Sequence, residues 1–106
     1  MTIFITGNKG YIGSVLADIL EQKGYAVIGY DTDYYYGCEL YLLPEPAKQI
    51  KKDIRDVSAA DLHGIDTVIH LAALSNDPLG ELNPRLTEEI NFHGTVRLAE
   101  LAKACT

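Results

Sequence analysis

The spacing of hydrophobic residues changes period twice within the first 31 positions. Residues 2–6 are apolar and β-branched on both faces, which predicts a buried strand of a parallel sheet. Over residues 11–23 the apolar positions recur every three or four residues, which predicts an amphipathic helix ending at Gly24. The apolar stripe of this helix consists of Ile12, Val15, Leu16, Ile19 and Leu20. Residues 26–31 form a second apolar run, so a strand–helix–strand unit opens the chain.

The middle of the chain has weaker periodicity. Residues 32–49 hold four of the seven tyrosines and two prolines, which predicts an irregular excursion with one short helical turn. Residues 50–54 predict a short third strand. Asp56 is expected to cap a brief helix that runs to Leu62 and ends at Gly64.

The last third of the chain predicts one more strand and one long helix. Residues 66–71 are apolar and predict the strand, and residues 84–105 predict the helix, with Pro84 in a first turn that needs no backbone donor. The stripe of that helix consists of Leu86, Ile90, Gly94, Leu98, Leu101 and Cys105. The element order β-α-β-(β)-α-β-α predicts an α/β fold, a doubly wound parallel sheet truncated after about four strands.

The composition restricts the class of protein. The 106 residues suit a single domain, and 47% hydrophobic residues argue against disorder. The formal charge of −6 disfavours binding to nucleic acid and to anionic membranes. No apolar run approaches the roughly 20 residues that cross a bilayer. Cys38 and Cys105 are too few for a disulfide framework, and His63 and His93 lack partners at metal-ligand spacing, so we expect a cytoplasmic chain without a metal site.

Three glycines separate the first predicted strand from the first helix. Gly7, Gly10 and Gly13 permit, in turn, a tight turn, the approach of a pyrophosphate to the backbone, and close packing of the helix. The helix N-terminus adds free N–H groups and about half a positive charge. The spacing is G-x-x-G-x-x-G rather than G-x-G-x-x-G, and strand-to-helix turns also use glycine without a ligand. The position between a strand and an amphipathic helix nevertheless favours a dinucleotide-binding loop.

Asp31 ends the second apolar run, where such a fold places an acceptor for the adenosine ribose hydroxyls. Its carboxylate also repels a 2′-phosphate: at about 5 Å and a dielectric constant near 20, each unit of charge costs on the order of 3 kcal/mol. No Arg or Lys follows before Lys48, so the sequence favours NAD over NADP. The alternative is an aspartate that merely ends a strand.

Five short motifs follow one another along the whole chain. They are Thr6-Gly-x-x-Gly-x-x-Gly13, Asp31, Asp53-Ile54-Arg55-Asp56, His70-Leu71-Ala72-Ala73 and Asn91-x-x-Gly94-Thr95. In this order and spacing they resemble the extended short-chain dehydrogenase/reductases, and within these the NAD-dependent sugar-nucleotide epimerase/dehydratase group. The resemblance implies a Rossmann fold, NAD as the cofactor, and a nucleotide-sugar as the substrate of the full-length enzyme.

The resemblance also implies roles for individual residues. Tyr11 and Ile12 would lie along the pyrophosphate with the three glycines. Asp53 would accept a hydrogen bond from the adenine amino group, while Ile54 packs on the ring. Gly94 would let the last helix approach the sheet. The residues that would line the cofactor after the fourth strand are Leu71, Ala72 and Ala73.

Simpler interpretations stay open for several of these positions. Asp53 could serve only the short helix after it, and residues 71–73 could be a transition from core to loop. Asn91 could cap or bridge backbone. His70, at the end of a buried strand, is expected to be a hydrogen-bonded core histidine rather than a catalytic one.

The catalytic pair of this family, Tyr-x-x-x-Lys, is absent from the sequence. None of the seven tyrosines is followed four positions later by lysine, and the catalytic Ser/Thr is missing too, so we expect no catalytic residue here. Residues 1–106 are therefore expected to be the N-terminal part of an NAD-binding domain, without the catalytic region or a substrate domain. In the strand order 3-2-1-4-5-6 the fourth strand is then an open edge, which predicts self-association through residues 67–71.

Three functions are compatible with these features. The leading one is the NAD-binding portion of a sugar-nucleotide epimerase or dehydratase, an oxidoreductase or isomerase that transiently transfers a hydride between NAD and a sugar ring carbon. The second is a non-catalytic module of the same fold that senses NAD. A third, an unrelated Rossmann-like methyltransferase, fits poorly with the glycine spacing and with the Asp53 and Leu71-Ala72-Ala73 motifs.

Overall fold

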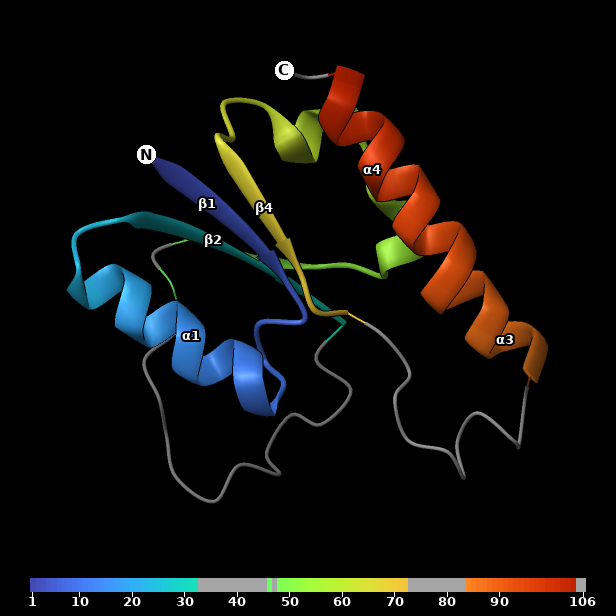
Figure 1. Ribbon diagram of the computed structural model, residues 1–106, viewed down its shortest axis with the longest axis horizontal. Helices are drawn as coiled ribbons and strands as arrows, with labels where there is room; N and C mark the ends of the chain where they lie inside the picture. Colours follow the sequence, from blue (N-terminus) through green and yellow to red (C-terminus); the bar gives the residue numbers. More distant parts are fainter. Residues whose placement is uncertain (33–45, 47, 73–83, 105–106) are drawn as a thin grey trace.

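A four-stranded parallel sheet forms the centre of the computed structural model, which describes residues 1–32, 46, 48–72 and 84–104. The strands are β1 (Thr2–Thr6), β2 (Ala26–Asp31), β3 (Lys48–Lys51) and β4 (Thr67–His70). Their order is β3-β2-β1-β4, and Thr6 pairs with Tyr30 on one side and His70 on the other. The carboxyl ends of β1, β2 and β4 therefore meet at one edge of the sheet, as the arrows in Figure 1 show.

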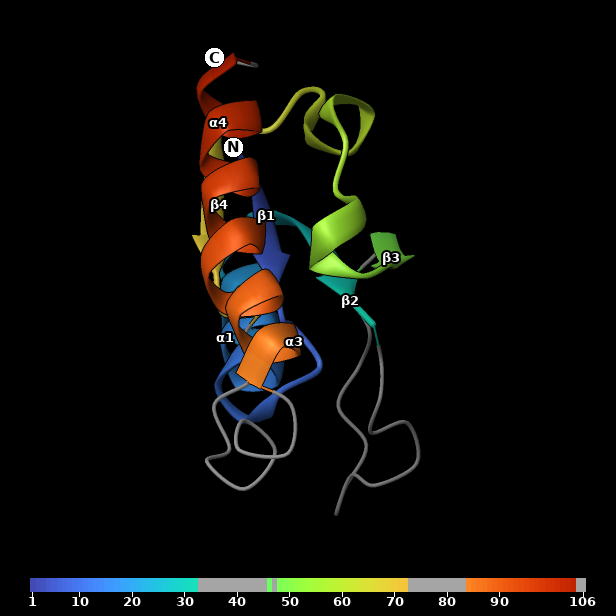
Figure 2. The ribbon, with the colours of Figure 1, turned by 90° about the vertical axis from the view of Figure 1, so that its right-hand side faces the viewer.

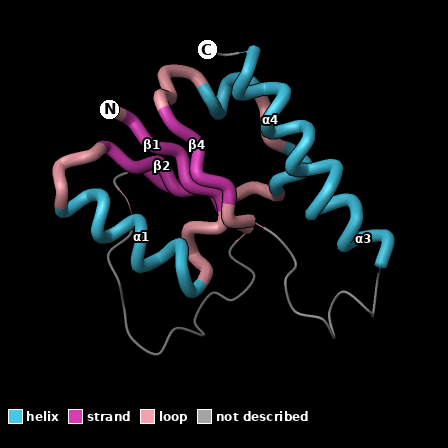
Figure 3. Tube along the Cα trace, in the orientation of Figure 1, coloured by secondary structure: helices cyan, strands magenta, loops and turns pink. Residues whose placement is uncertain are grey.

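Helices cover both faces of this sheet. Helix α1 (Tyr11–Gln22) packs on one face, and α3 (Pro84–Glu88), the π-helical turn η3 (Glu89–His93) and α4 (Gly94–Ala104) follow one another on the other (Figure 3). The short 3₁₀ turns η1 (Ile54–Asp56) and η2 (Ala59–Leu62) contact α4. Seen at right angles in Figure 2, α4 lies in front of the strands and α1 behind them. The predicted doubly wound α/β fold is confirmed for the described residues.

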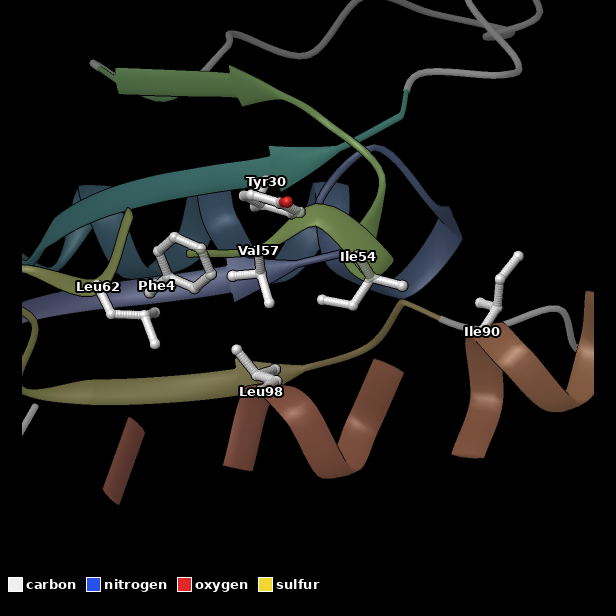
Figure 4. Close-up of a cluster of buried hydrophobic side chains, with 7 residues drawn as sticks. All are labelled: Phe4, Tyr30, Ile54, Val57, Leu62, Ile90 and Leu98. Carbon is white, nitrogen blue, oxygen red and sulfur yellow. The ribbon is translucent and has the colours of Figure 1, made fainter. Parts of the chain in front are cut away.

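Alternating side chains of β1 divide the interior into two cores. Phe4 points to the α4 side, where its ring lies 5.4 Å from that of Tyr30 (Figure 4). Ile3 and Ile5 point to the α1 side and pack with Ala17. The remaining buried members of the α4-side core are Ile54, Val57, Leu62, Ile90 and Leu98. A strand apolar at consecutive positions is explained by this two-sided burial.

The third strand and the turn after it differ from the prediction. β3 begins two residues and ends three residues earlier than expected, and it ends early because the chain turns at Asp53 and directs Ile54 into the core. Asp56 is not the helix cap: the Asp53 carboxylate accepts from the Arg55 backbone N–H at 2.9 Å. Ser58, paired with Asp61, caps the second turn. The expected brief helix is thus two separate 3₁₀ turns.

The ends and faces of the longer helices are partly as expected. Gly24 has a φ of +92° and follows α1, which confirms the predicted stop. The apolar stripe of α1 is only half buried, however. Leu16 and Leu20 pack on the core, but Ile12, Val15 and Ile19 are 65%, 44% and 42% exposed. The small Ala17 brings the helix close to the sheet, which turns those larger side chains toward solvent.

Several predictions fall on residues outside the described part. These are the tyrosine-rich excursion at 33–45, Ala73 with the loop after it, and the last stripe position, Cys105. Among the described residues, no helix has both the length and the apolar content needed to cross a bilayer.

Candidate functional site

The glycine turn after β1 is held against two neighbouring strands. The Gly7 backbone N–H donates to the Tyr30 carbonyl at 2.8 Å, and its φ of +72° favours glycine. A Cβ on Gly7 would lie 2.8 Å from the Ala72 nitrogen and from the Leu71 carbonyl carbon. A Cβ on Gly13 would collide with the Gly7 carbonyl oxygen. Two of the three predicted glycines are thus required by close backbone packing.

The N-terminus of α1 presents unsatisfied donors. Ser14 donates to the Gly10 carbonyl at 3.0 Å, but no acceptor among the described residues is recorded for the backbone N–H groups of Tyr11, Ile12 and Gly13. The first turn has no acidic side chain, and no side chain caps it within the described chain. The nearest atom to a Cβ built on Gly10 is the Gly7 oxygen at 3.3 Å. This arrangement leaves room and donors for an anion at the helix N-terminus.

Asp31, at the end of β2, is tied directly to the glycine turn. Its Oδ2 accepts from the backbone N–H of Lys9 at 2.9 Å. The carboxylate therefore lies beside the N-terminus of α1, at the end of the strand where this fold places a ribose acceptor. The placement agrees with the predicted ribose acceptor, whose role stays a prediction.

An amide pair next to this turn was not anticipated from the sequence. Asn8 is 2% exposed and its Nδ2 donates to Gln49 Oε1 at 2.7 Å, while Gln49 Nε2 donates back to Asn8 Oδ1 at 3.1 Å. The pair lies over Gly29 of β2, where a Cβ would collide with both amides. A lone glycine inside an apolar strand indicates such a close approach, so Gly29 was the available clue.

The Asp53 motif forms an ion-pair cluster at the same edge. Asp53 Oδ1 accepts from Arg55 Nε at 3.0 Å and Oδ2 from Arg55 Nη2 at 2.7 Å. These bonds lower the pKa of Asp53, chiefly through the Arg55 side chain. Arg55 Nη1 also donates to Glu89 Oε2 at 3.1 Å. The carboxylate thus caps η1 and retains limited capacity for an adenine amino group, so that role stays a prediction.

Ile54 lies in the core rather than at the surface. It is 4% exposed, and its Cγ2 lies 3.1 Å from the position of a Cβ on Gly94. The burial of its side chain disfavours the expected packing on an adenine ring, which stays untested. Gly94 does permit a close approach of α4, but to Ile54 of η1 rather than to a strand.

The end of β4 is fastened to the end of β1 by side chains. Thr6 Oγ1 lies 2.6 Å from His70 Nδ1 and accepts from the backbone N–H groups of Leu71 at 3.0 Å and Ala72 at 3.1 Å. His70 Nε2 lies 2.8 Å from Thr95 Oγ1. Burial lowers the pKa of His70. His70 is hydrogen-bonded through both ring nitrogens, as expected, but it is half-buried rather than part of the core.

The predicted residues thus converge on one edge of the sheet. Gly7, the N-terminus of α1, Asp31 and Leu71 all lie at the carboxyl ends of β1, β2 and β4 (Figure 1). The order β3-β2-β1-β4 reverses direction at β1, and open α/β sheets bind ligands at this switch point.

Comparisons with known proteins agree with this geometry. Residues 3–106 match the NAD dependent epimerase/dehydratase family. The chain is 32% identical over 109 residues to a UDP-glucose 4-epimerase of Mycolicibacterium smegmatis, covering 97% of this chain and 35% of the relative. It is 36% identical over 98 residues to short-chain dehydrogenase/reductase family 42E member 1 of Macaca fascicularis, covering 89% of this chain and 24% of the relative.

A solved structure shares the fold. A UDP-glucose-4-epimerase from Stenotrophomonas maltophila, crystallised with NAD and formylated UDP-arabinopyranose, superposes with a TM-score of 0.85 at 27% identity. The match covers 99% of this chain and 34% of that protein. The chain thus spans about a third or less of the lengths of these three proteins. With a match over residues 3–106 and the glycine turn, strand order and Asp31 in place, this chain belongs to the NAD dependent epimerase/dehydratase family.

Proposed function

We propose that this chain is the NAD-binding portion of a sugar-nucleotide epimerase or dehydratase. One observation carries the proposal: the open N-terminus of α1 lies beside the Asp31 carboxylate, and the Lys9 amide joins the two. The N–H groups of Tyr11, Ile12 and Gly13 bind the pyrophosphate, and Asp31 accepts from the ribose hydroxyls. The residues that line the cofactor further along are Asp53, Leu71, Ala72 and Ala73.

The chain's own residues bind and orient the cofactor. Bound NAD supplies the hydride acceptor for a carbon of the sugar ring. The glycine turn fixes the pyrophosphate, and Asp31 rejects a 2′-phosphate by charge repulsion. We place this activity in the cytoplasm, in keeping with the lack of a disulfide pattern.

The acid–base residues of the reaction are proposed to lie outside residues 1–106. None of the seven tyrosines begins a Tyr-x-x-x-Lys pair, and the relatives are about three times as long. The same observation favours the second candidate, a module that senses NAD without catalysis. A Tyr-x-x-x-Lys pair encoded after Thr106 decides for the enzyme, and its absence there decides for the module.

Calorimetric titration with NAD and NADP tests cofactor binding. We expect saturable binding of NAD and roughly hundredfold weaker binding of NADP. Asp31→Asn keeps an oxygen for the Lys9 amide but removes the charge. The variant is therefore expected to show a smaller difference in affinity between NAD and NADP. Asp18→Ala removes the same charge from the outer part of α1 and is the control. A folded chain that binds neither cofactor contradicts the proposal.

A further inference from the structure

Three side chains from three separate elements form a continuous hydrogen-bonded relay behind the proposed NAD site. Thr6 ends β1, His70 ends β4, and Thr95 lies in the first turn of α4. The two ring nitrogens of His70 lie 2.6 Å from Thr6 Oγ1 and 2.8 Å from Thr95 Oγ1. Thr95 Oγ1 in turn donates to the carbonyl of Asn91 at 2.7 Å.

The partners of the two hydroxyls determine where the ring proton lies. A threonine hydroxyl donates once and accepts at most twice. The Thr95 hydroxyl donates its hydrogen bond to the Asn91 carbonyl, so its oxygen must accept from His70 Nε2. With the ring proton on Nε2, His70 Nδ1 is an acceptor and takes the Thr6 hydroxyl proton; Thr6 Oγ1 in turn accepts from the Ala72 N–H and shares the Leu71 N–H with the Thr6 backbone carbonyl, 3.1 Å away. The relay is satisfied only by a neutral imidazole protonated at Nε2.

The same bonds fix the position of the backbone after β4. The Thr6 hydroxyl holds the Ala72 amide and shares the Leu71 amide with the Thr6 backbone carbonyl, and His70 sets the orientation of that hydroxyl. This segment lies directly against Gly7, where even a Cβ would come within 2.8 Å of it. A shift of the segment would therefore move the glycine turn or open a gap beside it.

We propose that His70 is a positioning residue for cofactor binding: as the neutral Nε2–H form it holds Leu71 and Ala72 against the glycine turn. This inference rests on the proposed function, because the positions it fixes are those that would contact NAD. His70 itself does not touch the cofactor in this account. It acts through Thr6, and α4 supports it through Thr95.

Protonation of His70 breaks this arrangement. A proton on Nδ1 leaves Thr6 with a third donor and no acceptor for its own hydroxyl proton. β1 and β4 have no other ionisable side chain, and burial is what lowers the His70 pKa. The ionisable side chains on the other elements around the ring, from the glycine turn, η3 and α4, are Lys9, Glu89, His93, Arg97, Glu100 and Lys103.

Three of these groups, Glu89, His93 and Arg97, engage other residues. Glu89 binds Arg55 and Arg85, His93 lies 4.0 Å from Glu88, and Arg97 donates to the Val57 carbonyl at 2.9 Å. The fold of the chain favours the neutral form of the His70 ring, and in this account the binding of NAD favours the same form. Affinity for NAD is therefore expected to hold down to the His70 pKa of the free folded chain, which burial places below the ordinary value of 6.5, and to fall as the pH drops through it.

Nuclear magnetic resonance of the ¹⁵N-labelled chain tests the proton assignment without any ligand. Long-range correlations of the His70 ring are expected to show the neutral Nε2–H tautomer at pH 7.5 and a pKa below 6.5. A ring protonated at Nδ1 at that pH overturns the proposal. His63, exposed at the end of η2, is the internal reference.

Variants then test whether the relay positions the backbone. His70→Phe keeps a ring but neither nitrogen, and is expected to speed hydrogen exchange of the Ala72 amide and to weaken NAD binding, each roughly tenfold. The Leu71 amide, which also donates to the Thr6 backbone carbonyl, is expected to change less. His70→Asn puts an amide oxygen near the Nδ1 position and is expected to recover part of both effects. His63→Asn is the matched control and leaves both unchanged.

The outcomes separate this inference from the proposed function. Failure of the unaltered chain to bind NAD contradicts the function, whereas the tautomer and the two amide exchange rates still decide the inference. Unchanged exchange in His70→Phe, or an NAD affinity that falls as steeply with acidification as in the unaltered chain, overturns it. If His70→Phe does not fold, Thr95→Val replaces it, with a smaller increase in exchange expected.

Discussion

The two faces of the sheet are built differently. On the α4 side, two aromatic rings pack with five buried aliphatic side chains from η1, η2, η3, α4 and the stretch between the two 3₁₀ turns (Figure 4). On the α1 side, four buried residues form a smaller core. There the helix is held close by Gly13 and Ala17, and three of its larger apolar side chains face outward.

We expect the α4 side to contribute mainly to the stability of the fold and the α1 side mainly to the proposed cofactor site. Hydrophobic stabilisation scales with buried apolar area, so the α4 side contributes more of it. The α1 side instead brings a helix N-terminus to the sheet edge, which needs small residues and a tight turn. Substitutions on the two faces are expected to affect different measurements.

The largest effect is expected from the α4-side core. Phe4→Ala removes a fully buried ring and is expected to lower the free energy of unfolding by about 3–5 kcal/mol. Phe92→Ala makes the same change at a 59% exposed position on η3 and should stay within about 0.5 kcal/mol. Urea unfolding followed by circular dichroism measures both, and equal losses would contradict the assigned core.

A pair of glycines tests the tight turn on the other face. Gly7 and Gly24 both have positive φ, at +72° and +92°, but only Gly7 has backbone where a Cβ would lie. Gly24→Ala is expected to cost about 1 kcal/mol from backbone strain alone. Gly7→Ala should cost about 2–4 kcal/mol and abolish NAD binding. If NAD binds equally to both variants, the turn does not form the site.

The open edge of β4 borders both faces and gives a third prediction. Within the described chain β4 pairs only with β1, so its other side offers unpaired backbone groups. Light scattering after size-exclusion chromatography is expected to show mass rising with concentration. Thr67→Lys, on the exposed start of β4, should reduce this rise in mass. Gln22→Lys on α1 adds the same charge and should leave the rise in mass unchanged. A monomer at every concentration contradicts this prediction.

The smallest effect is expected on the outer side of α1. Ile19→Gln replaces a 42% exposed side chain and should change the free energy of unfolding by less than about 0.5 kcal/mol. Leu20→Gln, one position further and packed on the core, should cost more than about 1 kcal/mol. The same urea titrations distinguish them, and equal losses would mean that Ile19 is buried like Leu20, as the sequence predicted.

Local pattern was sufficient for most of the framework. The first strand, the first helix and the second strand followed from period and glycine placement, since each is decided by nearby residues. The strand order followed from the element order and the order that a doubly wound fold has. The end of β3 differs from the prediction because the chain turns at Asp53, where the carboxylate binds Arg55. That turn is tied to Glu89, 34 positions away, which periodicity does not detect.

The residues of the site likewise divide into those that local pattern predicts and those that it does not. Its glycines and Asp31 were found because strand-to-helix turns place them at fixed spacing. Gln49 was missed because it contributes through a strand pairing, and the outward faces of Ile12, Val15 and Ile19 were missed because Ala17 sets the height of the helix. Helical spacing predicts that a stripe exists, but tertiary contacts decide how much of it is buried.

The amide pair over Gly29 limits how this site could be redesigned. Asn8, Gln49 and Gly29 fit only as a set, because any Cβ at position 29 displaces both amides. The next residue after Asn8 supplies the amide that holds Asp31. An engineer who exchanges Asp31 to accept a phosphorylated ribose therefore alters the loop as well as the charge. Transfer of the glycine turn into another protein would therefore require Asn8, Gln49 and Gly29 to be transferred together.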